Sequence, residues 1–342
     1  MRILYGVQAT GNGHITRARA MLPALQQAGI TVDFLFSGRE RAALFDMEAF
    51  GDFRVKAGFT FITQAGRVRA LSTLGAIKPI TFLRDVRALD VSAYDYVVTD
   101  FEPVSAWAAQ RQRKTVIGLA HQYALCHRLP GTERAYWLPA ALKAFAPATH
   151  LLGIHWHHFN QSILPPLITT SAPSVIEDHG FILVYLPFED LAAVVDWLRP
   201  IRGTRFRVYA AVKQAEDQEH IQIRPLSRTA FPQDLADCSG IITNSGFGLC
   251  SEALVLGKKI LTKPLRRQIE QFSNAQILHA MQRAVVMPDF DHHVLRQWLE
   301  APSFTPVVYP DVAAAVAAWL KSGCTDTPRG LCDRLWQQVS HP

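Results

Sequence analysis

Short apolar runs alternate with amphipathic segments of helix length along the first half of the chain. The run at 3–7 ends at a glycine-containing turn, and apolar residues then recur at helical spacing over 15–25, with Gly29 at the position of a C-cap. Further buried strands are predicted at 32–36, 96–99, 115–119 and 151–154. Strand–helix alternation of this kind predicts a parallel, doubly wound sheet.

The same alternation restarts after a proline-rich stretch without periodicity, 161–180, which is interpreted as a linker. A second parallel sheet is predicted from a helix over 190–198 and strands at 181–185, 206–209, 240–243 and 259–262. We therefore predict an α/β protein with two Rossmann-like domains, 1–160 and 181–310, whose strands point their carboxyl ends at a cleft. Residues 311–342 hold two helical segments that are placed to pack back on the first domain.

Composition is that of a globular protein. Of the 342 residues 49% are hydrophobic and 19% charged, and the length favours two hydrophobic cores. The five cysteines form no CxxC pair, which disfavours a disulfide framework or a structural zinc site. The chain opens without a secretion-type segment and has no apolar run of 18 residues, so a cytoplasmic location is expected.

The formal charge of +6 favours a negatively charged partner. Because Lys and Arg form no long block, a nucleic-acid partner is not expected. The segment 67–87 mixes basic and apolar residues, a composition that suits an anionic membrane surface. This segment predicts peripheral association at the inner face of the membrane. The alternative is an amphipathic helix whose apolar side belongs to the core.

The most informative turn lies between the strand 240–243 and a helix that begins directly after it. Gly246 and Gly248 are small enough to let the backbone approach a ligand closely. Amides at a helix start, with the positive end of the helix dipole, favour a phosphate group. Glu252 follows one helical turn later, within reach of ribose hydroxyls. The alternative is that the glycines serve only tight packing and that Glu252 is solvated.

A polar loop after the next strand leads into another helix. It carries donors and acceptors suited to sugar hydroxyls, and two arginines that can offset diphosphate charge. These residues are Gln268, Glu270, Gln271, Asn274, Arg266 and Arg267.

Taken in order, these residues resemble the donor-binding signature of GT-B glycosyltransferases, and the pattern is most similar to that of MurG-like and UDP-glucuronosyltransferase-like enzymes. The matching series is Ser245-Gly246-Phe247-Gly248, Ser251-Glu252-Ala253-Leu254, Leu256-Gly257-Lys258, Pro264 and Gln268-x-Glu270-Gln271-x-x-Asn274-Ala275.

The resemblance implies an inverting, metal-independent transfer without a cofactor. The sugar would move from a nucleoside-diphosphate sugar, expected to be a UDP-sugar, to a hydroxyl acceptor such as a lipid-linked or cell-envelope glycan. The implied roles are diphosphate binding by Ser245, Gly246, Phe247, Gly248 and Leu249, ribose binding by Glu252, and sugar recognition by Gln268, Glu270 and Gln271.

A second turn, Gly11-Asn12-Gly13-His14, follows the first strand at the edge expected to face the cleft. Thr16 stands where a dinucleotide fingerprint requires glycine. Similar enzymes carry Gly-x-Gly-His in this place, which implies that Gly11, Asn12 and Gly13 contact the acceptor. Histidine suits the removal of the acceptor proton, a contribution of about 10²–10⁴-fold. His14 is interpreted as this base, the alternatives being acceptor orientation and a capping or packing role.

Two residues at other strand ends are candidates for the same edge. Asp100 follows the strand 96–99 and either orients His14, binds acceptor hydroxyls, or caps the helix that starts near Pro103. His121 follows the strand 115–119 and is a candidate acceptor contact.

Several histidines gather near the end of the strand 151–154. They are His150, His155, His157, His158 and His179. Extended backbone points neighbours to opposite faces, and no Cys or carboxylate completes a ligand set. No metal site is therefore expected, and the cluster is assigned to packing near the linker or to acceptor contact.

Two rival functions stay open. A non-hydrolysing nucleotide-sugar epimerase would use the same donor turn with added acid–base carboxylates, and it would change a UDP-sugar without any acceptor. A binding protein without turnover would keep only the cleft, which the presence of His14 and Asp100 at its edge disfavours.

Overall fold

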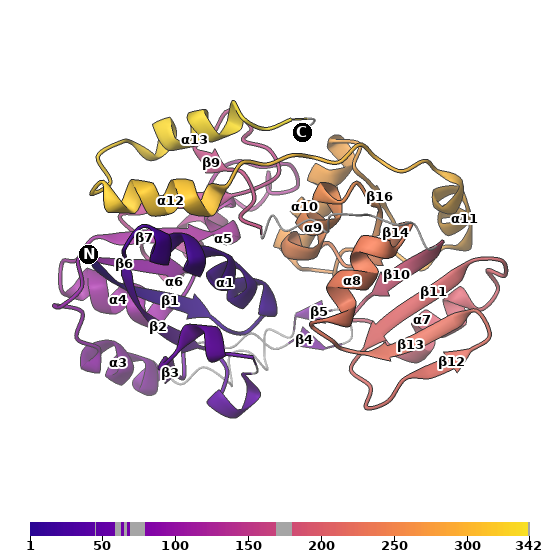
Figure 1. The fold of residues 1–342 in the computed structure, drawn as a ribbon, viewed down its shortest axis with the longest axis horizontal. Coiled ribbons are helices and arrows are strands. Elements are labelled where there is room, and N and C mark those ends of the chain that lie inside the picture. The colour runs from indigo at the N-terminus through magenta and orange to yellow at the C-terminus, as the bar shows by residue number, and fades with distance from the viewer. Residues whose placement is uncertain (45, 59–62, 65–66, 69–78, 169–179, 341–342) are drawn as a thin grey trace. The chain divides into compact units, whose positions relative to one another are not determined.

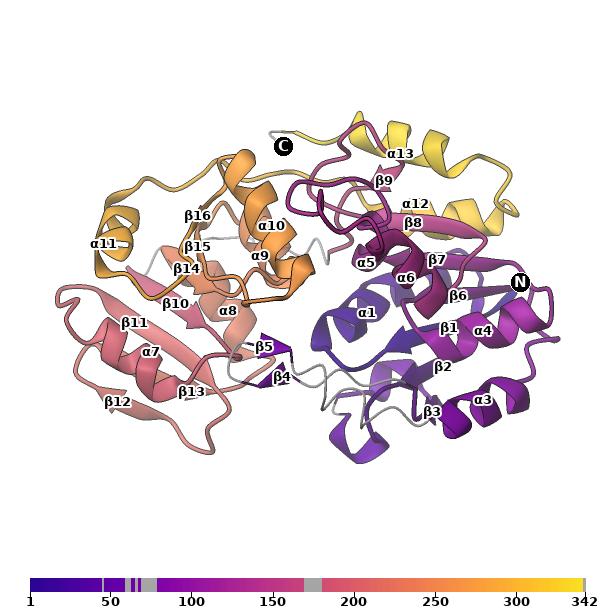
Figure 2. The same cartoon turned by 180° about the vertical axis from the view of Figure 1, so that it is seen from behind.

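The structure is a computed structural model, and it describes residues 1–44, 46–58, 63–64, 67–68, 79–168 and 180–340. The chain splits into two compact units. Unit 1 consists of Met1–Ile62, Arg69–Thr169 and Tyr309–Val339, and unit 2 of Thr63–Val68, Thr170–Val308 and Ser340–Pro342. Figures 1 and 2 show the elements of each unit.

Unit 1 is built on a seven-stranded parallel sheet in the order β3-β2-β1-β6-β7-β8-β9. Its strands are β1 (Arg2–Gln8), β2 (Thr31–Ser37), β3 (Arg54–Lys56), β6 (Tyr96–Asp100), β7 (Val116–Ala120), β8 (His150–Ile154) and β9 (Ile163–Leu164). Its helices are α1 (Asn12–Gln27), α3 (Pro79–Ala88), α4 (Pro103–Arg111), α5 (His121–Ala124), α6 (Leu138–Phe145), α12 (Val312–Lys321) and α13 (Pro328–Trp336). Short 3₁₀ turns occupy Arg41–Ala43 and Glu48–Phe50.

The core of unit 1 follows the alternation of its strands. Leu4 and Leu35 pack with Phe82 of α3 and Val104 of α4 on one face of the sheet. Successive side chains of a strand point to opposite faces, so Phe34 lies on the other face, where its ring contacts those of its neighbours. Helix α12, from the C-terminal part of the chain, lies beside α1 (Figure 1).

Unit 2 repeats this architecture in the order β12-β13-β11-β10-β14-β15-β16, with β12 antiparallel and the other pairs parallel. Its strands are β10 (Phe181–Tyr185), β11 (Arg205–Ala210), β12 (Glu216–Gln218), β13 (Ile221–Pro225), β14 (Gly240–Thr243), β15 (Lys259–Thr262) and β16 (Ala284–Val286). Its helices are α7 (Leu191–Leu198), α8 (Ala230–Asp237), α9 (Phe247–Val255), α10 (Ile269–Ala280) and α11 (His292–Glu300). The hairpin β4 (Thr63–Gln64) and β5 (Arg67–Val68) forms a separate two-stranded sheet.

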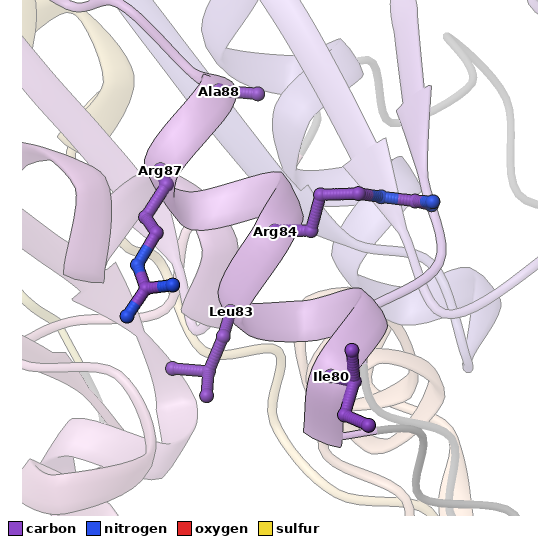
Figure 3. A pocket seen from close by; sticks show the side chains of 5 residues that line it. All are labelled: Ile80, Leu83, Arg84, Arg87 and Ala88. Atoms are coloured by element: carbon purple, nitrogen blue, oxygen red, sulfur yellow. The ribbon is translucent and has the colours of Figure 1, made fainter.

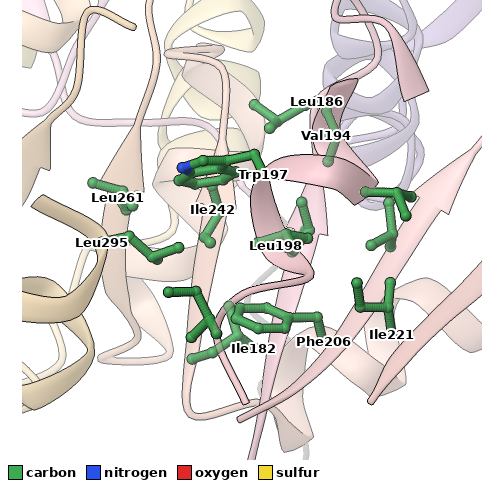
Figure 4. Packing of buried hydrophobic residues seen from close by; sticks show 14 of the residues in the cluster. Ile182, Leu186, Val194, Trp197, Leu198, Phe206, Ile221, Ile242, Leu261 and Leu295 are labelled. Atoms are coloured by element: carbon green, nitrogen blue, oxygen red, sulfur yellow. The ribbon is translucent and has the colours of Figure 1, made fainter. Parts of the chain in front are cut away.

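Helices on both faces bury the central strands of unit 2, which explains their continuous apolar runs. One core cluster joins Trp197 and Leu198 of α7 with Ile242 of β14 and Leu295 of α11 (Figure 4). The predicted α/β fold with two parallel sheets is confirmed.

The structure adds strands that a continuous apolar run does not indicate. The strands β3, β9, β12 and β16 are short and lie at sheet edges, and β13 alternates apolar with polar residues. Ile163–Leu164, which the sequence pattern places in the linker, instead forms the edge strand β9, and both residues are fully buried.

Strand order sets where a ligand can bind. In unit 1 the chain leaves β1 toward β2 and β3, then returns to β6 on the other side of β1. In unit 2 the same reversal falls between β10 and β14. Loops diverge beyond the carboxyl ends of strands at such reversals, which opens a crevice there in parallel sheets. No helix among the described residues is long and apolar enough to cross a membrane.

Candidate active site

In unit 1, three charged or titratable side chains meet where β1 and β6 end. Asp100 closes β6, and Val7 near the end of β1 is its neighbour in register. His14 stands in the first turn of α1 with Arg17 three residues later, a spacing that puts both on one helix face. His14 Nδ1 lies 2.7 Å from Asp100 Oδ1, and Arg17 Nη2 donates to the same oxygen at 2.7 Å.

The Asp100 carboxylate is fully buried, and its pKa reflects two opposing effects. Burial raises the pKa, whereas the charges of Arg17 and His14, and their hydrogen bonds, lower it. The net pKa lies below the ordinary value of 3.8, so Asp100 is ionised at neutral pH. His14 therefore faces a permanent negative charge.

The capping role considered for Asp100 belongs to another residue. Glu102 is the N-cap of α4, and its carboxylate accepts from Val104 N at 2.8 Å and Ser105 N at 2.6 Å. Ser37 Oγ also donates to Glu102, at 2.6 Å. Gly6 makes room for this cap, because a Cβ there would lie 2.0 Å from Ser105 Oγ. Asp100 is left to bind Arg17 and His14.

The turn before His14 is open. Gly11, Asn12 and Gly13 are exposed, and a Cβ built on Gly11 meets no described atom within 4 Å. Packing within the described protein therefore does not require glycine at position 11. Arg39 contacts this turn through Asn12 Oδ1 at 3.1 Å, a neighbour that the sequence pattern does not indicate.

His121 has internal contacts rather than an exposed face. Its side chain is 1% exposed, Nδ1 lies 3.0 Å from Ile154 O, and the ring packs against His155. His121 follows β7 as predicted, but its side chain is buried in the protein interior. We therefore do not retain it as an acceptor contact.

The other histidines are distributed over packing positions. His155 is buried, while His157 stacks on His158 with ring centroids 4.7 Å apart. Burial lowers the pKa of His157, followed by the effect of His158. No group of three His, Cys, Asp or Glu side chains that could hold a metal occurs in the part of the chain that the structure describes. His179 lies outside that part.

In unit 2, the turn between β14 and α9 has the form expected for anion binding. Gly246 is the N-cap of α9, and no side chain of the described residues caps it. The first turn of this helix contains no acidic residue. A Cβ built on Gly246 or Gly248 meets no described atom within 4 Å. The interpretation that these glycines serve tight packing is therefore wrong, and the helix start borders open space.

Polar side chains beneath this turn fix its backbone. Ser245 Oγ lies 2.7 Å from Thr262 Oγ1, so this buried hydroxyl is used inside the protein. Asn274 donates to Ser245 O at 2.9 Å, and Asn244 to Lys263 O at 2.8 Å. These bonds hold the amides of the turn in place without help from a ligand, which is the preorganisation that an anion site needs.

Glu252 projects from α9 in a partly buried position. Burial raises its pKa to about 7. Within the described ranges its carboxylate has no hydrogen-bond partner. The raised pKa and the lack of a partner distinguish it from a solvated surface glutamate, because solvation would keep its pKa near the ordinary value of 4.5.

The polar loop before α10 uses part of its hydrogen-bonding capacity on itself. Gln268 is the N-cap of α10 and accepts from Gln271 N, and the Gln271 side-chain oxygen accepts from Leu265 N at 3.0 Å. Each glutamine oxygen thus spends one of its two lone pairs within the loop, and the amide NH₂ groups remain available for sugar hydroxyls. Glu270 occupies the first turn of α10, where its negative charge suits the helix dipole.

The two arginines of this loop are exposed. Arg266 pairs with Asp289, and Arg267 has a positive φ of 65°. The Arg266 pair is solvent-exposed on both sides, which limits its strength.

A buried ion pair adjoins the turn between β14 and α9, and the sequence pattern did not indicate it. Lys263 directly follows β15, and Glu189 follows β10; their Nζ and Oε1 atoms lie 2.8 Å apart. The side chains are only 8% and 12% exposed. Asn244 Nδ2 lies 3.4 Å from the same Glu189 oxygen. A lysine directly after a fully buried strand is the signal that could have found it.

Together, the paired parallel sheets and the polar sites at their two reversal points define the GT-B class of glycosyltransferase. A family model described as Glycosyl transferase family 1 matches residues 1–302. The chain belongs to this family and is a glycosyltransferase.

Solved structures support the fold over the whole chain. SnogD from Streptomyces nogalater is 13% identical, with a TM-score of 0.57 and coverage of 98% of this chain and 99% of that one. UGT89C1 of Arabidopsis thaliana in complex with quercetin is 12% identical, with a TM-score of 0.61 and coverage of 98% of both chains. SsfS6 of Streptomyces sp. SF2575 in complex with thymidine diphosphate is 15% identical, with a TM-score of 0.57 and coverage of 98% and 99%. At these identities the likeness shows the fold alone. No curated protein matches the sequence.

Proposed function

We propose that the protein is an inverting glycosyltransferase that moves a sugar from a UDP-sugar to a hydroxyl of its acceptor. The uncapped start of α9 carries this proposal, because it presents backbone amides beside open space at Gly246 and Gly248. Unit 2 binds the donor, and unit 1 supplies the base and binds the acceptor.

The donor assignment gains support from related folds. UGT89C1 and LpCGTa are each solved in complex with UDP, and SsfS6 with thymidine diphosphate. In our proposal Gly246, Phe247, Gly248 and Leu249 hold the diphosphate through backbone amides. Ser245 contributes its backbone only, since its hydroxyl is bonded to Thr262. Glu252, which lacks a partner in the described structure, accepts hydrogen bonds from the ribose.

The chemistry is a single displacement. The acceptor oxygen attacks the anomeric carbon, its proton passes to His14, and the bond from that carbon to the diphosphate oxygen breaks. The electron pair leaves with the nucleoside diphosphate. One displacement inverts the anomeric centre. Asp100 lies 2.7 Å from His14 Nδ1 and stabilises the positive charge that the imidazole gains.

The leaving diphosphate needs positive electrostatics, which we assign to the fixed amides and the dipole of α9. On this proposal the reaction is metal-independent, and neither a metal nor another cofactor takes part. Turnover should be unchanged by EDTA and by added Mg²⁺. A rate that falls on chelation and returns with Mg²⁺ would replace this part of the proposal by metal-assisted departure.

We also propose a lipid-linked acceptor at an anionic membrane surface. Ile80 is 82% exposed and Leu83 48% exposed on α3, where they line a hollow together with Arg84 and Arg87 (Figure 3). Trp107 of α4 continues this surface. Phe82 and Val86 of the same helix belong to the core, so α3 has both a core side and an exposed apolar side.

The basic residues of this surface suit anionic headgroups, and its apolar residues suit the boundary with the acyl chains. Arg84, Arg87 and Arg111 are all exposed. Residues 69–78 of the segment that suggested membrane contact lie outside the described residues. With this surface the protein would work as a peripheral protein on the cytoplasmic face.

The central experiment separates donor binding from transfer. A UDP-sugar screen by thermal shift identifies the donor, because a site-specific ligand stabilises the native state. With that donor, His14→Ala should abolish transfer while UDP affinity measured by calorimetry persists. Release of UDP by His14→Ala at the wild-type rate would exclude His14 as the base. Conversion of the UDP-sugar to an epimer without acceptor would establish the rival function.

A further inference from the structure

Arg17 is a buried cation to which the proposed reaction gives no role. Its side chain is 9% exposed, although arginine is rarely buried without a specific partner. Arg17 Nε donates to Asp100 Oδ2 at 3.0 Å, and Nη2 donates to Oδ1 at 2.7 Å. This two-point contact fixes both the position and the plane of the carboxylate.

We propose that Arg17 is a positioning residue of the transfer reaction, which locks the Asp100 carboxylate and thereby directs the unprotonated nitrogen of His14 toward the acceptor. The inference rests on the proposed role of His14 as the base. It concerns how that base is prepared, and it assigns Arg17 no contact with a substrate.

The geometry of three atoms supports this role. Asp100 Oδ1, Arg17 Nη2 and His14 Nδ1 are separated by 2.7 Å along each edge, an equilateral triangle. The two-point contact uses one of the two Nη2 hydrogens on Oδ1. An unprotonated Nδ1 would place its lone pair 2.7 Å from an ionised carboxylate oxygen, which is repulsive, so a hydrogen must lie between Nδ1 and Oδ1. The carboxylate has no proton to donate. The hydrogen between Asp100 and His14 therefore belongs to Nδ1, which leaves the lone pair on Nε2.

Arg17 also acts on charge. Without its guanidinium, Asp100 would be a fully buried carboxyl whose burial raises its pKa, and it would become a poorer acceptor for Nδ1–H. Arg17 thus keeps the carboxylate partner of His14 ionised.

The remaining groups around this triad do not replace Arg17. Tyr5 of β1 is fully buried, and burial, followed by the negative charge of Asp100, raises the pKa of its hydroxyl well above 10, so it stays neutral. Tyr123 of α5 behaves in the same way and donates to Ala146 O at 2.8 Å. Arg39 contacts the turn at Asn12 and Thr10.

The test reads the tautomer directly. The protein contains 13 histidines, so the His14 signals in an ¹⁵N-histidine spectrum are assigned by their loss in His14→Gln. In the wild type we expect neutral His14 to carry its proton on Nδ1. In Arg17→Met we expect a mixture of the two neutral tautomers, because the carboxylate that holds Nδ1–H is no longer fixed in place. kcat should fall about tenfold or more, with KM for the UDP-sugar little changed.

Three further variants make the result specific. Arg17→Lys keeps the charge without the two-point contact, so its tautomers should be mixed as in Arg17→Met. Arg19→Met removes a charge from the same helix, where the guanidinium donates to Asp46 O, and it should change neither readout. If Arg17→Met is insoluble, Arg17→Gln repeats the test with a polar side chain that lacks both the charge and the two-point contact.

An Arg17→Met spectrum identical to that of the wild type would overturn this inference, whatever the rate. Failure of the proposed function has a different signature. If His14→Ala still transfers sugar, His14 is not the base, even where the tautomer depends on Arg17.

Discussion

Lys263 Nζ lies 2.8 Å from Glu189 Oε1, and this buried pair joins the end of β15 to the end of β10 next to the donor turn. Both residues stand at carboxyl ends of strands, on either side of β14. Lys263 N also donates to Thr243 O at 2.9 Å, so the pair is tied to the strand that leads into the turn. We regard it as the electrostatic support of that turn.

Removing one partner of this pair should destabilise unit 2. Glu189→Ala leaves the Lys263 ammonium buried without its counter-charge, at a cost of about 3–5 kcal/mol. Urea unfolding followed by tryptophan fluorescence measures the loss. The control is Asp289→Ala, which removes the exposed partner of Arg266 and should cost less than about 1 kcal/mol. Equal losses in the two variants would contradict the support role.

A substitution at Gly246 should affect ligand binding without affecting the packing of the protein. Its φ of −71° is ordinary for any residue, and a Cβ there meets no described atom within 4 Å, so Gly246→Ala should leave the thermal midpoint nearly unchanged. The same Cβ would border the proposed diphosphate, and UDP affinity should fall about tenfold or more. Calorimetry and thermal unfolding measure both effects.

Gly153→Ala is the matched control for that experiment. A Cβ at Gly153 would lie 2.4 Å from Ala124 N, so this variant should unfold at lower temperature because of a backbone clash in unit 1. Unchanged UDP affinity in Gly246→Ala would place the diphosphate elsewhere.

Glu252 should make donor affinity depend on pH. As a carboxylate it accepts hydrogen bonds from ribose hydroxyls, and its pKa of about 7 means that this form is gained as pH rises through 7. UDP-glucose should therefore bind more tightly at pH 8 than at pH 6, and Glu252→Gln should bind with little pH dependence. The probe is UDP-glucose and not UDP, because the terminal phosphate of UDP itself titrates near pH 6. A wild-type affinity that does not change over this range would remove the ribose assignment.

The contribution of Glu252 to the stability of the fold changes with pH in the direction opposite to its contribution to donor affinity. Its pKa is raised from 4.5 to about 7 in the folded protein, so between these values the folded state binds more protons than the unfolded state. The stabilisation is complete below pH 4.5 and is lost as pH rises through about 7. Relative to Glu252→Gln, the thermal midpoint of the wild type should fall over this range.

The exposed side of α3 should bind anionic vesicles through its arginines. The double variant Arg84→Glu and Arg87→Glu should lose flotation with vesicles that contain phosphatidylserine, and high salt should weaken the wild type in the same direction. Arg199→Glu with Arg202→Glu makes the same charge change on exposed residues of unit 2 and should still float. No wild-type binding at low salt would end the membrane proposal.

The local pattern of the chain was sufficient for the fold class and for placing several candidate residues at the ends of strands. Buried strands such as β10 and β14 are recognisable as short continuous apolar runs, because both of their faces are covered. His14 and the glycine turn of unit 2 lie in the segments that connect strands to the helices after them. Carboxyl ends of parallel strands share one edge of a sheet, so their position at that edge was predictable.

Tertiary structure decided which side chains meet and which are used internally. Spacing along the chain does not encode these contacts. They decide whether Asp100 or Glu102 caps α4, whether Gln271 bonds its own loop, and whether His121 reaches solvent. Arg17 with Asp100, and Glu189 with Lys263, are separated by 83 and 74 residues. The sequence by itself determined the periodicity of buried and exposed positions, because this depends on neighbours within a few residues. Only the folded arrangement determined the charge pairs, because their energies depend on burial and on distances set by strand order.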